Sequence, residues 1–466
     1  MVRGVDHNKT MMTITVNEII QATGGKVLCG GQHAVSGFSI DSRRTGKGEL
    51  FIALRGARFD GHDFVPDALR NGLGAIVSIP PADPGRDRTI IFVKNTLRAL
   101  QDIARYRRSR RGIPVVGVTG TNGKTTTKEL VAAILSQKHG VLKTTGNFNN
   151  HIGLPLCVSN MLGSEEFMVL EMGSNVRGDI RELCEIVRPD IAVVTNVGQA
   201  HLEGFGTIET VRDTDLEVLG YVKTVCINAD DPLLMEGIAS YQGRIVTYGI
   251  ENRADFSARE IVPAEEGSRF LLVTPGRGDI RISLRISGRF NVLNALAAAS
   301  VASELGMSLE EIRGGLESFG GVPMRLEMRR LSGAIVINDV YNANPASMEE
   351  ALKEMERVRT GRAIAVLGDM LELGAYAGDA HAELVQKLNL LGVDILIAVG
   401  PEMHKASAGF SRTAYQAASS SEARSLLLGM MGPGDTVLIK GSRGMAMEKV
   451  LAGEGPAAGA EGGNAL

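Results

Sequence analysis

The chain has 466 residues, with 50 lysines and arginines against 53 aspartates and glutamates, which leaves a formal net charge of −3 at pH 7. This near-neutral balance excludes a protein whose overall charge would hold nucleic acid or an anionic membrane. A content of 44% apolar and 22% charged residues is typical of a globular protein, and the length exceeds what one hydrophobic core usually organises, so we expect three domains.

Neither the cysteines nor the hydropathy indicates an exported or membrane-bound protein. The four cysteines lie far apart and form no CxxC pair, so neither a zinc site nor a disulfide framework is indicated. The first dozen residues lack an apolar core, and no run approaches the ~18 apolar residues of a spanning helix. We therefore expect a cytoplasmic monomer that uses small molecules and neither binds nucleic acid nor inserts into membranes.

The first domain is expected over residues 1–112, where short apolar runs alternate with helix-like stretches such as 64–71. This pattern predicts a small α/β domain. It ends in the basic run 105–111, which could bind nucleic acid but more simply places cations at the negative C-terminal end of a surface helix. The expected strands are 50–54, 75–79 and 89–93.

The second domain is expected over residues 113–321 and begins with a buried strand at 113–118, a glycine-rich loop and a helix over 125–137. Later strands alternate with helical segments, which predicts a parallel, doubly wound sheet of the P-loop ATPase kind. The region 256–288 is expected to form an antiparallel side sheet, because isoleucine and leucine alternate with arginine and serine over residues 280–287. The later parallel strands are expected at 167–170, 190–196 and 224–228, and two closing helices at about 290–305 and after Ser308.

The alternation of strands and helices resumes at residue 334 and predicts a third, Rossmann-like domain over residues 322–452. The tail, 453–466, is mostly glycine, alanine and polar residues, so we expect it to be disordered. The predicted fold class is therefore α/β with three domains. The strands of the third domain are expected at 334–340, 363–367, 394–399 and 435–439.

The loop at 117–126 reads Gly-Val-Thr-Gly-Thr-Asn-Gly-Lys-Thr-Thr and has the parts that a polyphosphate needs. Gly120 and Gly123 let the backbone approach the anion, Lys124 reaches outer phosphates, and the Thr125 hydroxyl suits Mg²⁺. The strict pattern GxxxxGKT is missed by one residue, because Val118 stands where its first glycine belongs. A glycine-rich turn that binds nothing is the alternative. The loop predicts bound phosphate without deciding between a hydrolase, a kinase and a ligase.

Two further polar residues are expected at the same edge of the sheet. Glu171 ends a buried strand, and His201 follows the strand that ends at Asn196. Because Mg²⁺ prefers oxygen ligands, a carboxylate near the threonine hydroxyl is expected in a nucleotide site. The alternative is that Glu171 caps a helix and that His201 is a satisfied loop histidine.

Together with motifs elsewhere, these residues resemble the ATP-dependent Mur ligases of peptidoglycan synthesis over nearly the whole chain. The motifs are Gly120-Thr-Asn-Gly-Lys-Thr-Thr126, Thr145-Gly-Asn-Phe-Asn-Asn150 with Gly153 and Pro155, Glu171-Met-Gly173, Asn196 to His201, Asn291-Val-Leu-Asn294, Arg325 and Asp339-Val-Tyr-Asn-Ala-Asn-Pro345.

Within that family, four stretches look most similar to the ligase that adds D-alanyl-D-alanine to UDP-N-acetylmuramoyl-tripeptide, an acyl-phosphate-forming step of cell-wall synthesis. The Asp-Asn-Pro-Arg motif of the diaminopimelate-adding relative is absent. The four stretches are 41–43, 50–54, 367–374 and 438–444.

The resemblance implies sites for ATP, Mg²⁺ and the UDP-linked peptide. Asn294 would contact the adenine, Arg325 the phosphates and Asp339 the ribose. The implied ATP-binding residues are Gly120, Thr121, Asn122, Gly123, Lys124, Thr125, Thr126, Asn294, Arg325 and Asp339. The implied catalytic residues are Lys124, Glu171 and His201, and the implied metal residues are Thr125, Glu171 and His201. The implied substrate-binding residues are Ser42 and Arg43 near the UDP group and Asn149 and Asn150 near the peptide.

One position departs from the family. Many members carry, shortly after the histidine, a lysine that becomes carbamylated and helps to hold a second Mg²⁺; by its spacing from His201 this position falls on Asp215. Our hypothesis is that Asp215 supplies a carboxylate to the metal, directly or through water. The alternative is a plain surface aspartate in a helix.

Two rival functions stay open, and both use the same loop. One is a P-loop ATPase or switch that drives a partner, and the other is a different Mur-type or folylpolyglutamate-type ligase. The residues that hold the carboxylate of D-alanyl-D-alanine are less defined, with Asp369, Ser442 and Arg443 as candidates at strand ends of the third domain.

Overall fold

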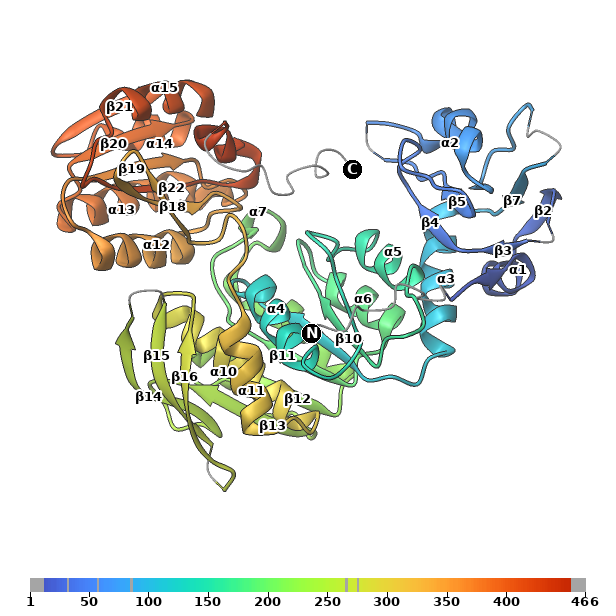
Figure 1. The fold of residues 1–466 in the computed structure, drawn as a ribbon. Coiled ribbons are helices and arrows are strands. Elements are labelled where there is room, and N and C mark those ends of the chain that lie inside the picture. Colours follow the sequence, from blue (N-terminus) through green and yellow to red (C-terminus); the bar gives the residue numbers. More distant parts are fainter. Residues whose placement is uncertain are drawn as a thin grey trace, which may run out of the picture.

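The computed structural model describes residues 12–31, 33–56, 58–83, 87–264, 267–274 and 276–453. The strands form four sheets in three α/β domains, which confirms the predicted fold class. In Figure 1 the first domain (blue) and the third domain (orange to red) lie on two sides of the central domain (cyan to yellow). No helix within these ranges is long and apolar enough to cross a membrane. Residues 454–466 lie outside them, so disorder of the tail stays a prediction.

The first domain has a five-stranded sheet. Its elements are β1 (Ile14–Thr15), α1 (Val16–Thr23), β2 (Lys26–Cys29), β3 (Ala34–Val35), β4 (Gly37–Ser39), β5 (Glu49–Ile52), α2 (Val65–Asn71), β6 (Gly74–Val77), β7 (Thr89–Phe92) and α3 (Thr96–Ser109). The order is β2-β7-β6-β5-β4, with β4 to β7 parallel and β2 antiparallel to β7. Residues of β5, β6 and β7 pack with Leu100 and Ile103 of α3, so this helix belongs to the core.

Part of the basic run 105–111 packs against neighbouring segments, which corrects the expectation that these cations lie at the end of a surface helix. Arg107 is 2% exposed, and its guanidinium donates to the backbone carbonyls of Met12 and Met161. Arg108 donates to the carbonyl of Val187 in the central domain. The run therefore joins the first domain to the second, because buried guanidinium groups need carbonyl partners.

The central domain is built on a nine-stranded sheet. Its elements are β8 (Val115–Thr119), α4 (Lys124–Leu135), β9 (Val141–Lys143), α5 (Gly153–Ser159), β10 (Phe167–Glu171), α6 (Asp179–Val187), β11 (Ile191–Val194), α7 (Leu202–Phe205), α8 (Ile208–Asp215), β12 (Thr224–Asn228), α9 (Pro232–Gly237), β13 (Arg244–Gly249), β14 (Phe256–Pro263), β15 (Ser268–Thr274), β16 (Gly278–Leu284), α10 (Arg289–Glu304) and α11 (Leu309–Ser318). The order is β16-β15-β14-β13-β12-β11-β8-β10-β9.

Alternation along β8 explains how two cores form on this sheet. Val116 and Val118 pack with α4 and α10 on one face, whereas Val115 packs with α5 and α6 on the other. Strands β9 to β14 are parallel, and β14, β15 and β16 form the predicted antiparallel side sheet. β8 thus lies inside the parallel part, between β10 and β11, and its carboxyl end opens onto the phosphate loop.

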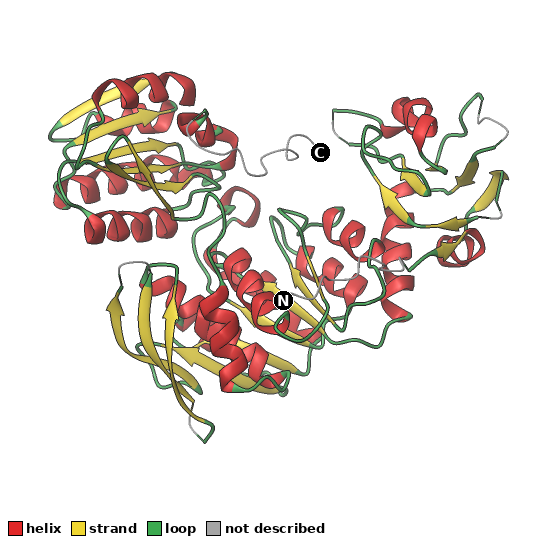
Figure 2. Ribbon diagram, in the orientation of Figure 1, coloured by secondary structure: helices red, strands yellow, loops and turns green. Residues whose placement is uncertain are grey.

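The third domain has a six-stranded sheet in the order β17-β18-β22-β19-β20-β21. Its elements are β17 (Glu327–Leu331), β18 (Ala334–Asp339), α12 (Pro345–Val358), β19 (Ala363–Gly368), η3 (Gly374–Tyr376), α13 (Ala377–Leu390), β20 (Ile395–Val399), α14 (Pro401–Ser407), β21 (Thr413–Ala417), α15 (Ser420–Met430) and β22 (Thr436–Lys440). All strands except β17 are parallel. Figure 2 shows helices on both faces of this sheet, as a Rossmann-like domain requires.

Candidate functional site

The loop between β8 and α4 needs glycine at two positions. Gly120 has φ +119° and Gly123 has φ +82°, which are left-handed conformations that other residues rarely adopt. A Cβ atom on Gly123 would lie 2.3 Å from Oδ1 of Asn294, and one on Gly120 would lie 2.2 Å from Oγ1 of Thr195. The loop therefore packs closely against β11 and α10 while the N-terminus of α4 faces the cavity, which is the arrangement that binds phosphate.

The end of β11 braces this loop. Asn196 accepts a hydrogen bond from the Asn122 amide at 3.0 Å and returns one from its side chain to the Asn122 carbonyl, also at 3.0 Å. The Thr121 hydroxyl accepts from the Gly198 amide at 2.8 Å. The second residue of α4's first turn, Thr125, and its neighbour Thr126 line the same cavity.

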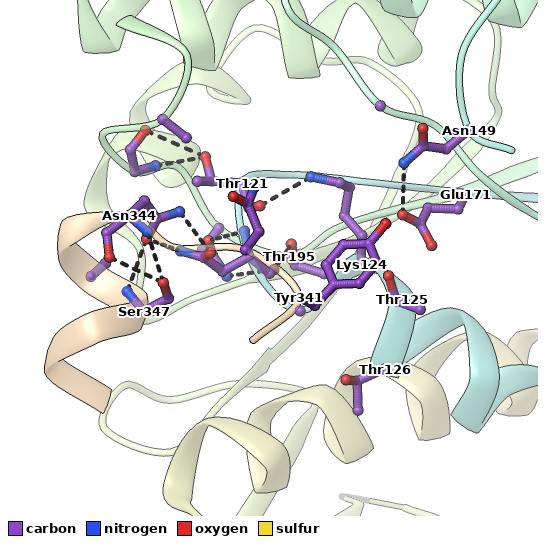
Figure 3. A pocket seen from close by; sticks show the side chains of 18 of the residues that line it. Thr121, Lys124, Thr125, Thr126, Asn149, Glu171, Thr195, Tyr341, Asn344 and Ser347 are labelled. Atoms are coloured by element: carbon purple, nitrogen blue, oxygen red, sulfur yellow. Dashed lines mark hydrogen bonds between the residues drawn. The ribbon is translucent and has the colours of Figure 1, made fainter. Parts of the chain in front are cut away.

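Lys124, the first residue of α4, bends back over the loop (Figure 3). Its Nζ donates to the carbonyls of Gly120 at 2.5 Å and Thr121 at 3.0 Å. Burial lowers the pKa of Lys124, and the negative charges of Asp215 and Glu171 oppose this shift. The ammonium group is thus held at the position that the outer phosphates of a nucleotide require.

Glu171, the last residue of β10, lines the cavity, and one of its carboxylate oxygens accepts no hydrogen bond from the described residues. Its Oε1 accepts from Nδ2 of Asn149 at 2.9 Å, and the two side chains point toward each other in Figure 3. Its Oε2 is buried and has no hydrogen-bond partner among the described residues. Within the same residues no three Asp, Glu, His or Cys side chains come together as a metal cage. One orphaned carboxylate oxygen beside the Thr125 hydroxyl suits Mg²⁺, which usually keeps water and phosphate ligands.

The third domain closes the other side of a cavity of about 690 Å³. Nη2 of Arg325 donates to Oγ1 of Thr125 at 3.0 Å, and the guanidinium lies 4.1 Å from the ring centroid of Tyr341. Asp339 accepts from Nζ of Lys440 at 2.6 Å and from the Leu326 amide at 3.1 Å. Since Arg325, Tyr341, Asp339 and Lys440 all line the cavity, it contains groups from two domains.

Asn294 and Asn149 both line this cavity. Asn294, on α10, accepts from the Thr127 hydroxyl at 3.3 Å and donates to Oδ1 of Asn291 at 3.2 Å. Asn150 also lines the cavity, but its Oδ1 already accepts from the amides of Ile152 and Gly153. These asparagines therefore line the cavity and also form hydrogen bonds that stabilise the segments around them.

His201 and Asp215 differ in their access to the cavity. His201 lines it, in a left-handed conformation with φ +52°, and its Nδ1 lies 2.5 Å from Oε2 of Glu372 in the third domain. Asp215 is 1% exposed, accepts from the Thr119 hydroxyl at 2.8 Å and does not line the cavity. Burial raises the pKa of Asp215, and Lys124 opposes this shift. Asp215 is therefore not the surface aspartate of the alternative interpretation.

The remaining predicted residues lie elsewhere. Ser42 and Arg43 belong to the first domain and do not line the cavity; Arg43 is 86% exposed and pairs with Asp41 at 2.8 Å. Arg443 lines the cavity. The oxygens of Asp369 accept from the amides of Glu402 and Met403.

Two of the three candidates for the dipeptide carboxylate thus have structural roles. Like Asp369, Ser442 is buried, and its hydroxyl accepts from the Leu371 amide at 2.9 Å. Arg443 is the candidate that keeps access to the cavity.

Three residues in or beside the cavity were not predicted to be functional from the sequence. Tyr341 lies within a quoted motif, and its ring stacks on Arg325. Lys440 ends β22, opposite Asp339 in the strand register, so strand-end polarity could have identified it. Lys128 lies one helical turn after Lys124, and only packing shows that it is buried near Glu171.

Comparison with known proteins agrees with this architecture. Three family descriptions match in succession: the Mur ligase family, catalytic domain over residues 34–108, the Mur ligase middle domain over 118–302, and the Mur ligase, glutamate ligase domain over 324–443. The UDP-N-acetylmuramoyl-tripeptide–D-alanyl-D-alanine ligase of Bacillus subtilis is 35% identical over 438 residues, which cover 90% of this chain and 93% of that protein.

Solved structures are similar over the same extent. A crystal structure of MurF from Acinetobacter baumannii has a TM-score of 0.87 at 32% identity and covers 95% of this chain and 99% of that one. The MurF ligase of Thermotoga maritima, in complex with ADP, has a TM-score of 0.79 at 33% identity and covers 89% of this chain and 96% of that one.

Proposed function

The chain belongs to the Mur ligase family, and we propose that it is an ATP-dependent ligase that joins D-alanyl-D-alanine to UDP-N-acetylmuramoyl-tripeptide during the synthesis of peptidoglycan precursors. One observation carries the proposal. The phosphate loop with Lys124 and Glu171 faces Arg325 and Asp339 of the third domain across one cavity. A site divided in this way can hold a nucleotide and shield a reactive intermediate from water.

The chemistry follows from what an amide bond needs. A carboxylate is a poor electrophile in water until one of its oxygens becomes a good leaving group. We propose that the terminal carboxylate of the UDP-linked peptide attacks the γ-phosphoryl group of ATP in line, which releases ADP and leaves an acyl phosphate. The amine of D-alanyl-D-alanine then attacks the acyl carbon and displaces phosphate.

Positioning and charge compensation are the main contributions of this chain. Lys124 and the amides of the loop would hold the phosphates while negative charge shifts between oxygens. Arg325 would reach the same phosphates from the third domain. The nucleoside would lie between Asn294 and Asp339, whose carboxylate is oriented by Lys440.

The residues present fit a Mg²⁺ ion. Glu171 supplies the orphaned oxygen and Thr125 the hydroxyl, and His201 lines the same space. When bound, the ion would offset charge on the phosphate oxygens. In this structure Arg325 donates a hydrogen bond to the Thr125 hydroxyl. Arg325 would therefore move away when the Thr125 hydroxyl binds the ion. Asp215 would act through Lys124 or through water.

The peptide substrate would extend from the cavity toward the first domain. Asn149 and Asn150 would contact the muramoyl-peptide, and Ser42 and Arg43 the UDP group. The exposed guanidinium of Arg43 is compatible with a phosphate ligand. We further propose that the protein acts in the cytoplasm, since its four cysteines are free thiols.

A phosphate-release assay tests the function. Purified protein receives ATP alone, then UDP-N-acetylmuramoyl-tripeptide, then D-alanyl-D-alanine as well, and phosphate and peptide product are measured. We expect sustained release only with both substrates, and a loss of roughly 10²-fold or more in Lys124→Met. Lys223→Met, which changes an exposed lysine just before β12, should keep the activity.

The rivals predict other outcomes of this assay. Sustained phosphate release with ATP alone would favour an ATPase that drives a partner. Release that requires a folate and glutamate, or a different UDP-linked peptide and amino acid, would favour another ligase of the superfamily.

A further inference from the structure

A buried lysine stands behind Glu171, outside the cavity. Lys128, on α4, is 0% exposed, and its Nζ lies 3.8 Å from Oε2 of Glu171. It does not line the cavity. An ammonium group is costly to bury unless nearby groups compensate it, and an apolar side chain would fill the same space more cheaply. The location of Lys128 therefore calls for an explanation in terms of its neighbours.

Two of these neighbours fix the ammonium group in place. Nζ donates to the Thr144 carbonyl at 2.7 Å and lies 3.0 Å from Oε1 of Glu129. Glu129 in turn pairs with Lys143 at the surface. These contacts use two of the three donors of the ammonium group, and Nζ stays 3.8 Å from Oε2 of Glu171, beyond hydrogen-bond distance but close enough to attract the carboxylate. Lys128 thereby attracts Oε2 without donating a hydrogen bond to it.

Thr144 connects the lysine to Glu171 by a second route. The Glu171 amide donates to Oγ1 of Thr144 at 3.0 Å, while the carbonyl of the same threonine accepts from Lys128. On the far side, Asn149 holds Oε1. Glu171 is thus held by its backbone amide, by the hydrogen bond to Oε1 and by the charge of Lys128 near Oε2, which itself accepts no hydrogen bond from the described part of the chain.

We propose that Lys128 is a positioning residue, which holds the Glu171 carboxylate at the edge of the cavity, where it can serve the Mg²⁺ ion that accompanies the nucleotide. The inference rests on the proposed function, because it assumes that nucleotide and Mg²⁺ bind in this cavity. Lys128 acts only through Glu171 and touches neither ligand. Groups that orient a metal ligand in this way typically contribute 10- to 100-fold to metal affinity.

The test measures how strongly Mg²⁺ promotes ADP binding, by titration calorimetry with Mg²⁺ and with a chelator. In Lys128→Met, which keeps length but removes charge and donors, the tightening of ADP binding by Mg²⁺ should fall roughly tenfold. The affinity for ADP without Mg²⁺ should stay within about twofold. Lys128→Gln, which keeps a donor for Thr144, should lose less, and it replaces the methionine variant if that one fails to fold.

A double-mutant cycle separates positioning from general packing. In the background of Glu171→Gln, Lys128→Met should cause no further loss of the Mg²⁺ effect. Lys223→Met, at an exposed lysine just before β12, is the control and should keep the full effect. The inference is overturned if the Lys128 variants retain the Mg²⁺ effect, or if the loss is equal in the Glu171→Gln background. If the unchanged protein shows no Mg²⁺ effect on ADP, the proposed nucleotide site itself fails.

Discussion

The charge of Lys124 is balanced from beneath the phosphate loop as well as from the cavity. Asp215 is the first of the negative groups that oppose the fall in the pKa of Lys124, and Glu171 is the second. The Asp215 carboxylate accepts from the hydroxyls of Thr119 at 2.8 Å and Ser174 at 3.4 Å. A buried carboxylate with these partners can influence the charge of Lys124 electrostatically without contacting a ligand.

Removing the charge of Asp215 should therefore change the metal dependence of turnover. Asp215→Asn keeps an acceptor for Thr119 but leaves Lys124 less compensated, and we expect the Mg²⁺ concentration for half-maximal activity to rise roughly tenfold. Asp213→Asn, which changes an exposed aspartate on the same helix, is the control. Unchanged turnover and Mg²⁺ dependence in Asp215→Ala would remove any role of this residue in the metal site.

At the scale of elements, α4 depends on α11 for its position. The helix that carries Lys124 packs against α11 through Ile134, whose backbone closely approaches Gly315. α11 begins with a capping box, in which Ser308 and Glu311 satisfy each other's backbone amides. Glu311 also pairs with Lys138, just beyond the end of α4. One carboxylate thus links the start of one helix to the end of the other.

This link should depend on pH. The hydrogen bonds from Lys138 and Ser308 lower the pKa of Glu311 from its usual 4.5 to about 2. Because the folded-state pKa is lowered, the stabilisation is complete above about pH 4.5 and is lost as the pH falls toward 2. Glu311→Gln should lower the melting temperature at pH 7, and this difference should shrink below pH 4.5. Glu310→Gln, on the same turn, removes an exposed carboxylate that pairs with Arg313 instead of Lys138; an equal fall in the melting temperature at pH 7 would contradict the assignment.

At the scale of the molecule, the third domain touches the phosphate loop directly. Asn122 and Asn344 exchange side-chain hydrogen bonds, one at 2.9 Å and one at 3.4 Å. Farther out, the Glu203 amide donates to the Glu372 carbonyl at 3.2 Å. None of the described residues of the first domain, in contrast, lines the cavity. In Figure 1 the first domain, which carries the proposed UDP-binding residues, lies apart from the third domain.

Ligands should bring these parts closer together. Because the nucleotide and the UDP-linked peptide would each contact more than one domain, we expect the radius of gyration to fall when a non-hydrolysable ATP analogue, UDP-N-acetylmuramoyl-tripeptide and D-alanyl-D-alanine are all present. Small-angle X-ray scattering measures this change. Lys124→Met, which should bind the nucleotide poorly, is expected to compact less. An unchanged radius with all three ligands would count against closure.

Much of the fold followed from local patterns along the chain. The strand over 224–228 was predicted with the bounds that β12 has, and the alternation over 280–287 predicted β16 and the antiparallel side sheet. The edge strands β2, β4, β9, β17 and β21 were missed, because at most one apolar side chain in each of them is buried. β13 was missed as well, since Arg244 and Thr247 interrupt its apolar residues.

The sequence by itself determined the phosphate loop, the fold class and the family, because glycines, a lysine and strand-end polar groups at fixed spacing are local signals. Only the tertiary structure decided which charges meet. It shows that Asp215 and Lys128 are buried. It also shows that Arg325 donates to Thr125 and that Lys440 pairs with Asp339, although these partners lie about 200 and about 100 positions apart in the sequence. Charge and burial depend on distance in space, which spacing in the sequence does not encode.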